Sequence, residues 1–432
     1  MLNAVPRPRP PEDFIVLYCV RTLLEGDSIM RVPLASTGLK SEQIEDAIAV
    51  LRSGNLTMGQ RVLEFETAMA GYLEVDHFVM VNSGSSANLA IVEALLRPTR
   101  GAPRLAAGDE VLVPAIAWPT TVWPVLQLGL KARFVDIRKD TLSIDLRKAQ
   151  KIVDENRNVK AIFPIHPLGF GIPGEELEQF AASNRLVLIN DVCESLGSWS
   201  NGVHAGTNGL ASSFSFYFSH HITTMEGGGV ATNDAEIADD LRAIRSHGWS
   251  RDRSDSESWH DELSPTDRKF TFVSTGFNIR PMEIQAAIGI SEVRKISQYV
   301  ERRREIAEHV WQVLKPTGLN VIGHELLTGA NASSHSWMHI PIEVPPEAFV
   351  KDRLIQELES RGVDTRPVLT GNFLQQPSAK RYLAFSEAPE SFVEANEISA
   401  NSFLVGCHHD LTEGQVNHLL ESLSESADLA RR

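Results

Sequence analysis

The chain contains 432 residues, of which 42% are hydrophobic and 22% charged, the composition of an ordinary globular protein with two or three domains. It has 41 Lys and Arg residues against 56 Asp and Glu residues, and the resulting formal net charge of −15 makes nucleic acid an unfavourable partner. The sequence has no run of about 18 apolar residues, which predicts no membrane-spanning helix, and its three cysteines predict a cytoplasmic protein without a disulfide framework.

The N-terminal region divides into an irregular part and a helix. Residues 1–30 are expected to be an extension, because prolines at positions 6, 8, 10 and 11 oppose regular structure. A helix is expected to begin at Ser41 and to end at Gly54, since apolar residues recur between them at helical spacing. These apolar residues are Ile44, Ala47, Ile48 and Leu51.

From about residue 62 to 235, short apolar strands alternate with amphipathic helices, a pattern typical of an α/β domain with a mostly parallel sheet. The expected strands are His77–Val81, Glu110–Val113, Ala132–Val135, Ala161–Ile165, Leu186–Ile189 and Gly229–Thr232, and the expected helices include Ser86–Leu96 and Glu175–Ser183. Helical propensity then dominates residues 281–314. We therefore predict a large domain over residues 31–290, followed over 291–432 by a long linking helix and a smaller α+β domain.

The small residues of Ser83–Ser86 lie between an expected strand and an expected helix. The backbone N–H groups and hydroxyls of Gly84 and Ser85 could close around an anion at the helix N-terminus. An ordinary capped helix start explains the same residues. Both interpretations remain open at this point.

A second glycine-rich segment, Gly169–Gly174, fits the dinucleotide-binding pattern G-x-G-x-x-G. It follows an expected strand, and Asp191 closes the next strand at nearly the spacing of a ribose-binding acid. However, Pro173 removes a backbone donor from the loop, and the unit lies deep in the chain. A nicotinamide-dependent enzyme therefore stays a weaker alternative.

Two residues could bind an aromatic ligand. Asp191 ends an apolar strand, where a carboxylate points into the ligand crevice and can keep a heteroaromatic nitrogen protonated. Trp118 follows another strand and could stack on a ring. A helix cap and core packing are the respective alternatives.

The segment from Ser215 to Gly229 is the most distinctive in the chain, with two adjacent histidines followed by Glu226 and three glycines. The side chains of His220 and His221 should diverge, because neighbouring residues point in different directions, so we expect no shared metal. The same argument applies to residues 407–410, Cys-His-His-Asp, which we interpret as loop or packing. No metal site is predicted.

Several motifs in order resemble the vitamin B6-dependent sugar aminotransferases of the DegT/DnrJ/EryC1/StrS family, from about residue 31 to 425. The resemblance implies the aspartate-aminotransferase fold, an α/β architecture with a large, mostly parallel sheet and a smaller C-terminal domain. The motifs are Gly59–Glu66, Asn82–Ala87, Gly108–Pro114, Asp191, Ser215–Gly229 and Gly276–Ala287.

One position departs from the family pattern. The family has a lysine six residues before Glu-Gly-Gly, which forms the Schiff base with the cofactor, and this chain has His220 there. Imidazole cannot form such an imine, but it can move protons near neutral pH. Histidine at this position resembles a subgroup, the nucleotide-sugar 3-dehydratases, which remove a hydroxyl instead of transferring an amine.

The resemblance implies a role for each matching residue, with His220 as the catalytic base. The cofactor would be pyridoxamine or pyridoxal 5′-phosphate, held without a covalent bond, and the phosphate would rest on Gly84, Ser85 and Ser215. Trp118 would stack on the ring, Asp191 would hold its nitrogen, and Glu194 would contact its hydroxyl. In a homodimer with the active site at the interface, Asn278 would reach the phosphate from the other subunit. Candidate substrate-binding residues are His221, Arg280, Arg366 and Asn372.

The cysteines decide between two branches of this subgroup. One branch carries an iron–sulfur cluster on four cysteines, whereas this chain has only Cys19, Cys193 and Cys407. The resemblance therefore favours the branch of the colitose pathway, which has no cluster and regenerates its cofactor with L-glutamate. The predicted reaction removes the C3 hydroxyl of a nucleotide-linked 4-keto-6-deoxyhexose. An aminotransferase with another base and a non-catalytic B6-binding relative remain alternatives.

Overall fold

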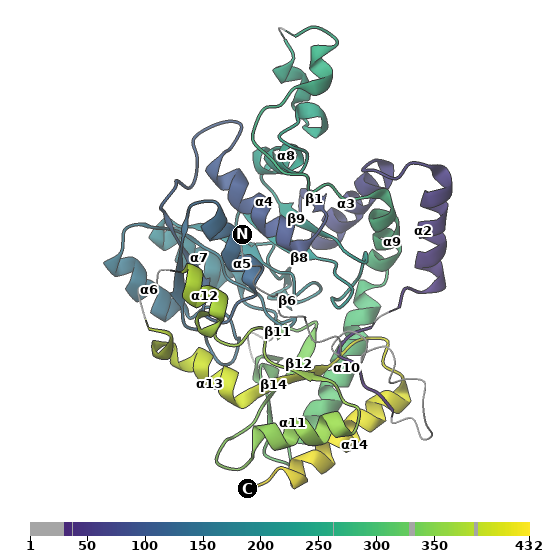
Figure 1. The fold of residues 1–432 in the computed structure, drawn as a ribbon, viewed down its shortest axis with the longest axis vertical. Coiled ribbons are helices and arrows are strands. Elements are labelled where there is room, and N and C mark those ends of the chain that lie inside the picture. Colours follow the sequence, from purple (N-terminus) through teal and green to yellow (C-terminus); the bar gives the residue numbers. More distant parts are fainter. Residues whose placement is uncertain (1–29, 37, 262, 328–332, 384–387) are drawn as a thin grey trace, which may run out of the picture.

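The computed structural model describes residues 30–432 except residues 37, 262, 328–332 and 384–387. The predicted extension therefore lies outside the described residues, apart from Met30. Two main sheets organise the fold, a large one built from residues 77–232 and a small one from residues 320–406. Helices cover both sides of the large sheet (Figure 1). No helix in the described part is long and apolar enough to cross a bilayer.

The large sheet has seven strands in the order β1-β9-β8-β5-β4-β2-β3. Only β9 runs antiparallel to its neighbours, which confirms the predicted mostly parallel sheet. The strands are almost wholly buried because helices cover both faces, which explains their short apolar runs. Their bounds are β1 His77–Val81, β2 Glu110–Pro114, β3 Lys131–Val135, β4 Val159–Ile162, β5 Val187–Asp191, β8 Ala211–Ser215 and β9 Gly228–Thr232.

The sequence analysis missed β8, a central strand of this sheet. Its sequence, Ala-Ser-Ser-Phe-Ser, has no continuous apolar run, yet Ser212 and Ser213 are buried. Their hydroxyls donate to the backbone carbonyls of Gly206 and Asn190, so burial leaves neither hydroxyl unpaired. Strand β4 also ends at Ile162 rather than at the predicted Ile165, which forms only an isolated bridge to Asp191.

The helices of the first half are α2 Ser41–Ser53, α3 Gln60–Leu73, α4 Gly84–Leu96, α5 Pro119–Gln127, α6 Leu146–Glu155, α7 Gly174–Asn184 and α8 Ala235–Ile244. Helix α2 ends at Gly54 as predicted, where φ is 74°. After α8, residues 249–261 and 263–275 form an arm that projects from the body (Figure 1), with short 3-10 turns at Ser250–Asp252, Ser256–Trp259 and Asp267–Phe270.

The helical stretch expected over residues 281–314 is two helices, α9 Glu283–Val293 and α10 Ile296–Leu314. Helix α10 leads to the small sheet, ordered β10-β12-β14-β13, and to α11 and α14, which lie together below it (Figure 1). The predicted domain limits at residues 290 and 291 stay a prediction. The remaining elements are β10 Asn320–Val321, β12 His339–Glu343, α11 Lys351–Ser360, β13 Thr365–Arg366, α12 Pro377–Tyr382, α13 Val393–Asn401, β14 Ser402–Gly406 and α14 Glu413–Leu429, with a three-stranded ribbon of β6 Trp199–Ser200, β7 Val203–His204 and β11 Ser333–Ser334.

Candidate active site

A cavity of about 270 Å³ lies where several strands of the large sheet end. Parallel strands direct their carboxyl ends to one edge, so residues that follow β1, β2, β5 and β8 meet there. Residues from the small-sheet region close the opposite side, among them Met338 and Leu369. Eight of the predicted site residues line this cavity: Gly84, Ser85, Trp118, Asp191, Glu194, Ser215, His220 and Arg366.

The first turn of α4 provides donors for an anion. The hydroxyl of Ser83 caps the helix by accepting from the Ser86 N–H at 3.1 Å. The N–H groups of the residues after the cap, Gly84 and Ser85, have no partner within a helix. A Cβ on Gly84 would lie 2.6 Å from the Cβ of Ser215, so glycine is required for β8 to end against this turn. The Ser215 hydroxyl therefore lies beside the same donors.

Asp191, at the end of β5, is 4% exposed, and its carboxylate is held by three neutral donors. Oδ2 accepts from Asn88 Nδ2 at 2.8 Å and from Thr121 Oγ1 at 2.7 Å, and Oδ1 accepts from the Cys193 N–H at 3.1 Å. The sequence analysis missed Asn88 and Thr121. Helical periodicity could have found Asn88, because it follows Gly84 by four residues on α4 and so shares its face.

Glu194 and Arg366 form the charged side of the cavity. Burial raises the pKa of Glu194, although its Oε2 accepts from the Leu168 N–H at 3.0 Å and the nearby charge of Arg366 opposes the rise. The Arg366 side chain forms no hydrogen bond or ion pair with the residues that the structure describes. Its guanidinium is therefore available for an anionic ligand. Trp118, 45% exposed, presents its indole to the same space.

His220 lines the cavity and has a defined tautomer. Its Nδ1 is 2.5 Å from the backbone oxygen of Cys193. Because a carbonyl oxygen can only accept, Nδ1 carries the proton, which leaves the lone pair on Nε2 free. Burial lowers the pKa of His220 to about 4, with the charges of Arg303 and Arg366 adding to the effect. The imidazole is therefore neutral at physiological pH and can accept a proton.

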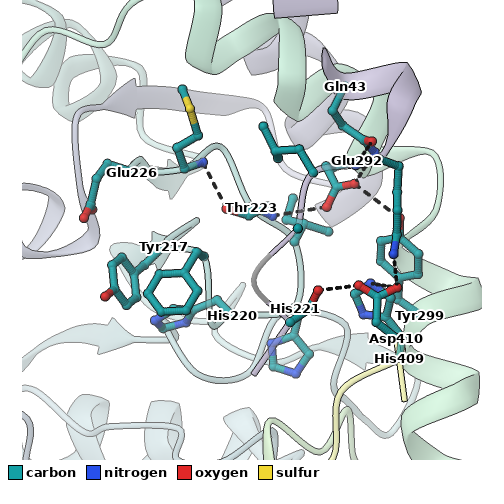
Figure 2. Close-up of a pocket in the computed structure, with 17 residues that line it drawn as sticks. Gln43, Tyr217, His220, His221, Thr223, Glu226, Glu292, Tyr299, His409 and Asp410 are labelled. Atoms are coloured by element: carbon teal, nitrogen blue, oxygen red, sulfur yellow. Dashed lines mark hydrogen bonds and ion pairs between the residues drawn. The ribbon is translucent and has the colours of Figure 1, made fainter. Parts of the chain in front are cut away.

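His221 points away from His220, as predicted for adjacent residues. Its Nε2 donates to the Ser336 carbonyl at 3.2 Å, and it lines a second cavity of about 290 Å³ instead of the first. Figure 2 shows this second cavity between the loop that carries His220 and the side chains of Tyr299 and Asp410. Tyr217, His220 and Glu226 line both cavities, so the two cavities adjoin at the proposed catalytic base, His220.

Three predicted residues line neither cavity. Asn278 and Arg280 lie after the arm, where Arg280 Nε donates to Asn278 Oδ1 at 3.1 Å. Asn372 is buried, and its amide donates to the Pro389 carbonyl at 3.1 Å and to Asn396 Oδ1 at 2.9 Å. Its own oxygen accepts from the Leu374 N–H, so its side chain stabilises a turn and does not face the site.

The segment Gly169–Gly174 is not shaped for a dinucleotide. Its Gly169 N–H donates to Ser195 Oγ at 3.1 Å, and its Gly171 N–H donates to His335 Nδ1 at 3.0 Å. These donors are therefore used inside the protein and cannot bind a pyrophosphate. The nicotinamide alternative loses its structural basis.

Comparison with known proteins agrees with this geometry. The profile of the DegT/DnrJ/EryC1/StrS aminotransferase family matches residues 38–424. The chain belongs to this family. Two GDP-4-keto-6-deoxy-D-mannose 3-dehydratases, from Yersinia pseudotuberculosis and Escherichia coli, are 34% and 33% identical to it, over 92% and 91% of this chain and 99% and 100% of theirs.

Solved structures of such a dehydratase have the same fold. The E. coli enzyme with bound hydrated PLP superposes with a TM-score of 0.82 at 33% identity, covering 92% of this chain and all of that one. A variant of the dehydratase with bound GDP-perosamine gives the same TM-score and identity over 91% of this chain. Within the DegT/DnrJ/EryC1/StrS family, the fold class predicted from the sequence is thus confirmed.

Proposed function

We propose that this protein is a pyridoxamine 5′-phosphate-dependent 3-dehydratase, which removes the C3 hydroxyl of a nucleotide-linked 4-keto-6-deoxyhexose. One observation carries the proposal: a neutral histidine, His220, faces the cavity at the position of the aminotransferase lysine. No lysine is among the described residues that line this cavity. Three similar relatives have a 3-dehydratase activity in their names.

The donor set of the cavity fits a B6 phosphate held without a covalent bond. The helix start at Gly84 and Ser85, with the Ser215 hydroxyl, would bind the phosphate. Asp191, fixed by its three donors, would keep the pyridine nitrogen protonated. The indole of Trp118 would stack on the ring. No iron–sulfur cluster on four cysteines of this chain is possible, since it has three.

When bound, pyridoxamine phosphate supplies an amine that condenses with the C4 keto group and a ring that takes up an electron pair. The proton transfers are carried out by side chains of the protein. His220 Nε2 would remove a proton from carbon and return one to the departing C3 hydroxyl, since one base can serve both transfers. Its Nδ1–H bond to the Cys193 carbonyl keeps the reactive nitrogen in position.

Arg366 and Glu194 would act on the substrates. The guanidinium of Arg366, which has no hydrogen-bond or ion-pair partner in the described part of the chain, is suited to a carboxylate of L-glutamate, the proposed amino donor, or to a phosphate of the nucleotide. Glu194, whose pKa is raised by burial, would contact the ring hydroxyl of the cofactor. The second cavity, which adjoins the first at Tyr217 and His220, offers space for the rest of the nucleotide sugar.

We also infer a homodimer in which each subunit completes the other's site. Asn278 lines neither of the two cavities described above and lies exposed beside the arm, which supports the prediction that it serves a partner's cofactor phosphate. Large apolar side chains are exposed on the arm, on α2 and on α3. They include Phe270, Phe272, Ile44, Leu51 and Leu63. Such surfaces are typical of protein–protein contacts.

A two-step assay tests the proposed function. Purified protein is first mixed with pyridoxal phosphate and L-glutamate, and absorbance reports conversion to the pyridoxamine form. GDP-4-keto-6-deoxymannose is then added, and the sugar is followed by mass spectrometry without any reductase. We expect a product lacking one oxygen, together with 2-oxoglutarate and ammonia.

The other outcomes each have a distinct meaning. An amine at C4 of the product would indicate an aminotransferase with a non-lysine base. Pyridoxamine formation with an unchanged sugar would reject GDP-4-keto-6-deoxymannose as the substrate. Binding of pyridoxal phosphate with no reaction would favour a non-catalytic relative and contradict the proposal.

A further inference from the structure

Arg303, on α10, lies behind the wall of the cofactor cavity and is 1% exposed. Its guanidinium binds backbone carbonyl oxygens from three parts of the chain. Nη1 donates to those of Trp337 and Met338, both at 3.1 Å, and of Cys407 at 2.8 Å, and Nη2 donates to that of His220 at 3.4 Å. It forms no ion pair with any described residue. A buried cation without a counter-ion is costly, so its presence needs an explanation.

Two of these carbonyls belong to residues that line the cavity from different parts of the fold. His220 comes from the loop after β8, and Met338 precedes β12 of the small sheet. We propose that Arg303 is a positioning residue, which fixes His220 relative to the small-sheet side of the active site. The proposal rests on the role of His220 in the proposed function.

Besides forming these hydrogen bonds, Arg303 affects the pKa values of nearby histidines through its charge. Three buried imidazoles nearby, His221, His339 and His408, have ring nitrogens without a partner in the described chain. Burial lowers the pKa of each, and the charge of Arg303 lowers it further. The guanidinium therefore keeps a neutral set of histidines behind the active site.

His220 itself is subject to opposing charges. Asp191 and the Cys193 carbonyl favour its protonated form, whereas Arg303 and Arg366 oppose it. Loss of the Arg303 charge should therefore make His220 easier to protonate.

This interpretation also accounts for residues 407–410, a motif with no other assigned role. The Cys407 carbonyl accepts from Arg303, and its thiol donates to the Arg303 backbone oxygen at 3.2 Å. His409 stacks on Tyr299 with the ring centres 3.6 Å apart. The motif therefore packs around α10 beside the arginine.

Two substitutions separate geometry from charge. Arg303→Lys keeps the cation but cannot bind several carbonyls in one plane, and Arg303→Met keeps much of the volume without charge. Arg304 offers a matched control. It is the next residue of α10 and also binds carbonyls, those of His335 at 2.7 Å and Gly197 at 3.5 Å, but neither of these residues lines the active-site cavity.

The test combines two measurements on the full-length protein, with and without pyridoxal phosphate. The first is the pH dependence of carbethoxylation of His220 by diethyl pyrocarbonate, read by peptide mass spectrometry, because only neutral imidazole reacts. The second is the rate of the half-reaction with L-glutamate. For Arg303→Lys we expect kcat to fall by about 10²-fold with KM within threefold, because a small displacement of a base has such an effect.

For Arg303→Met we expect the midpoint of His220 modification to rise by about one pH unit, while Arg304→Met leaves the midpoint unchanged. An unchanged midpoint in Arg303→Met, or equal loss of kcat in the lysine variants of Arg303 and Arg304, would overturn the proposal. If the wild-type protein shows no half-reaction, the proposed function fails. The modification midpoint would still decide whether Arg303 controls His220.

Discussion

At the scale of the residue, the chemistry depends on one substitution relative to the aminotransferases, and His220→Lys tests it. A lysine there would hold the cofactor covalently and would return the proton to the cofactor carbon. We expect a yellow, tethered enzyme that loses dehydration and gains some aminotransferase activity. Absorbance and mass spectrometry of the sugar product measure both changes. Full dehydratase activity in this variant would contradict the role of His220.

His220→Asn tests the base more directly, because it keeps a polar side chain without a titratable nitrogen. We expect the rate of dehydration to fall by about 10²–10⁴-fold if general base catalysis is its role. His418→Asn, on α14 and outside both cavities, serves as the control and should react like the wild type. A near-normal rate for His220→Asn would show that another group, and not His220, transfers the proton.

At the scale of the element, periodicity in the sequence predicted most strands and helices, but it could not show the contacts between distant segments. Strand β1 has the predicted bounds because its residues 78–81 form a continuous apolar run. Strand β8 was missed because its serines interrupt the apolar run. They can be buried only because backbone carbonyls from other segments accept their hydrogen bonds, which the sequence does not show. The predicted site residues between Gly84 and His220 in the sequence meet in one cavity. Asn372 does not line this cavity, and only the tertiary structure reveals the groups to which its amide binds.

The junction of α4 with β8 gives a prediction at this scale. In Gly84→Ala, the new Cβ would lie 2.6 Å from the Cβ of Ser215 and 2.8 Å from Cys193 Sγ, so the helix start must move. We expect the Kd for pyridoxal phosphate to rise by about tenfold or more, because the phosphate donors move with the helix. Absorbance titration measures this Kd.

Gly71→Ala is the matched control, since Gly71 lies within α3 and no atom is within 4 Å of an added Cβ. It should leave the Kd unchanged and stabilise the helix by about 0.5–1 kcal/mol. Equal affinity of the Gly84 and Gly71 variants would show that the start of α4 does not bind the cofactor.

At the scale of the whole molecule, the proposed dimer predicts which surface is covered. Ile44 and Leu51 of the predicted apolar face of α2 are exposed, with Leu51 57% accessible, and Leu63 on α3 is equally exposed. Leu51→Glu combined with Leu63→Glu should shift the protein from dimer to monomer in sedimentation velocity and reduce its activity. Val393→Glu, on α13 and 52% exposed, should remain dimeric. A double variant that sediments like the wild type would exclude this face from the interface.

The buried histidines predict how the stability of the molecule depends on pH. Burial lowers the pKa of His204, His335 and His408 to about 4, below the ordinary value of 6.5. Between pH 6.5 and 4 the unfolded chain therefore binds protons that the folded chain does not, so stability falls as the pH falls. Each of these histidines should lower the free energy of unfolding by about 1.4 kcal/mol at pH 5.5 relative to pH 8.

The carboxylates do not produce the same loss in this range. Asp255, whose pKa is lowered to about 2, and Asp239, whose pKa is also lowered, lose their stabilising effect only at pH values below those at which the histidines act. Glu292, whose pKa burial raises, acts in the opposite direction. A fall in Tm between pH 8 and pH 5.5 should therefore report mainly on histidine.

His335 allows the contribution of one histidine to be isolated. Its Nδ1 accepts from the Gly171 N–H and its Nε2 donates to the Gly323 carbonyl, both at 3.0 Å, so only the neutral ring satisfies both bonds. His335→Gln should be less stable at pH 8 but should lose less stability on acidification, because the titrating group is gone. His309→Gln, at an exposed position of α10, should keep the wild-type slope. Denaturant unfolding at both pH values measures the slopes, and an unchanged slope in His335→Gln would mean that this ring does not drive the acid sensitivity.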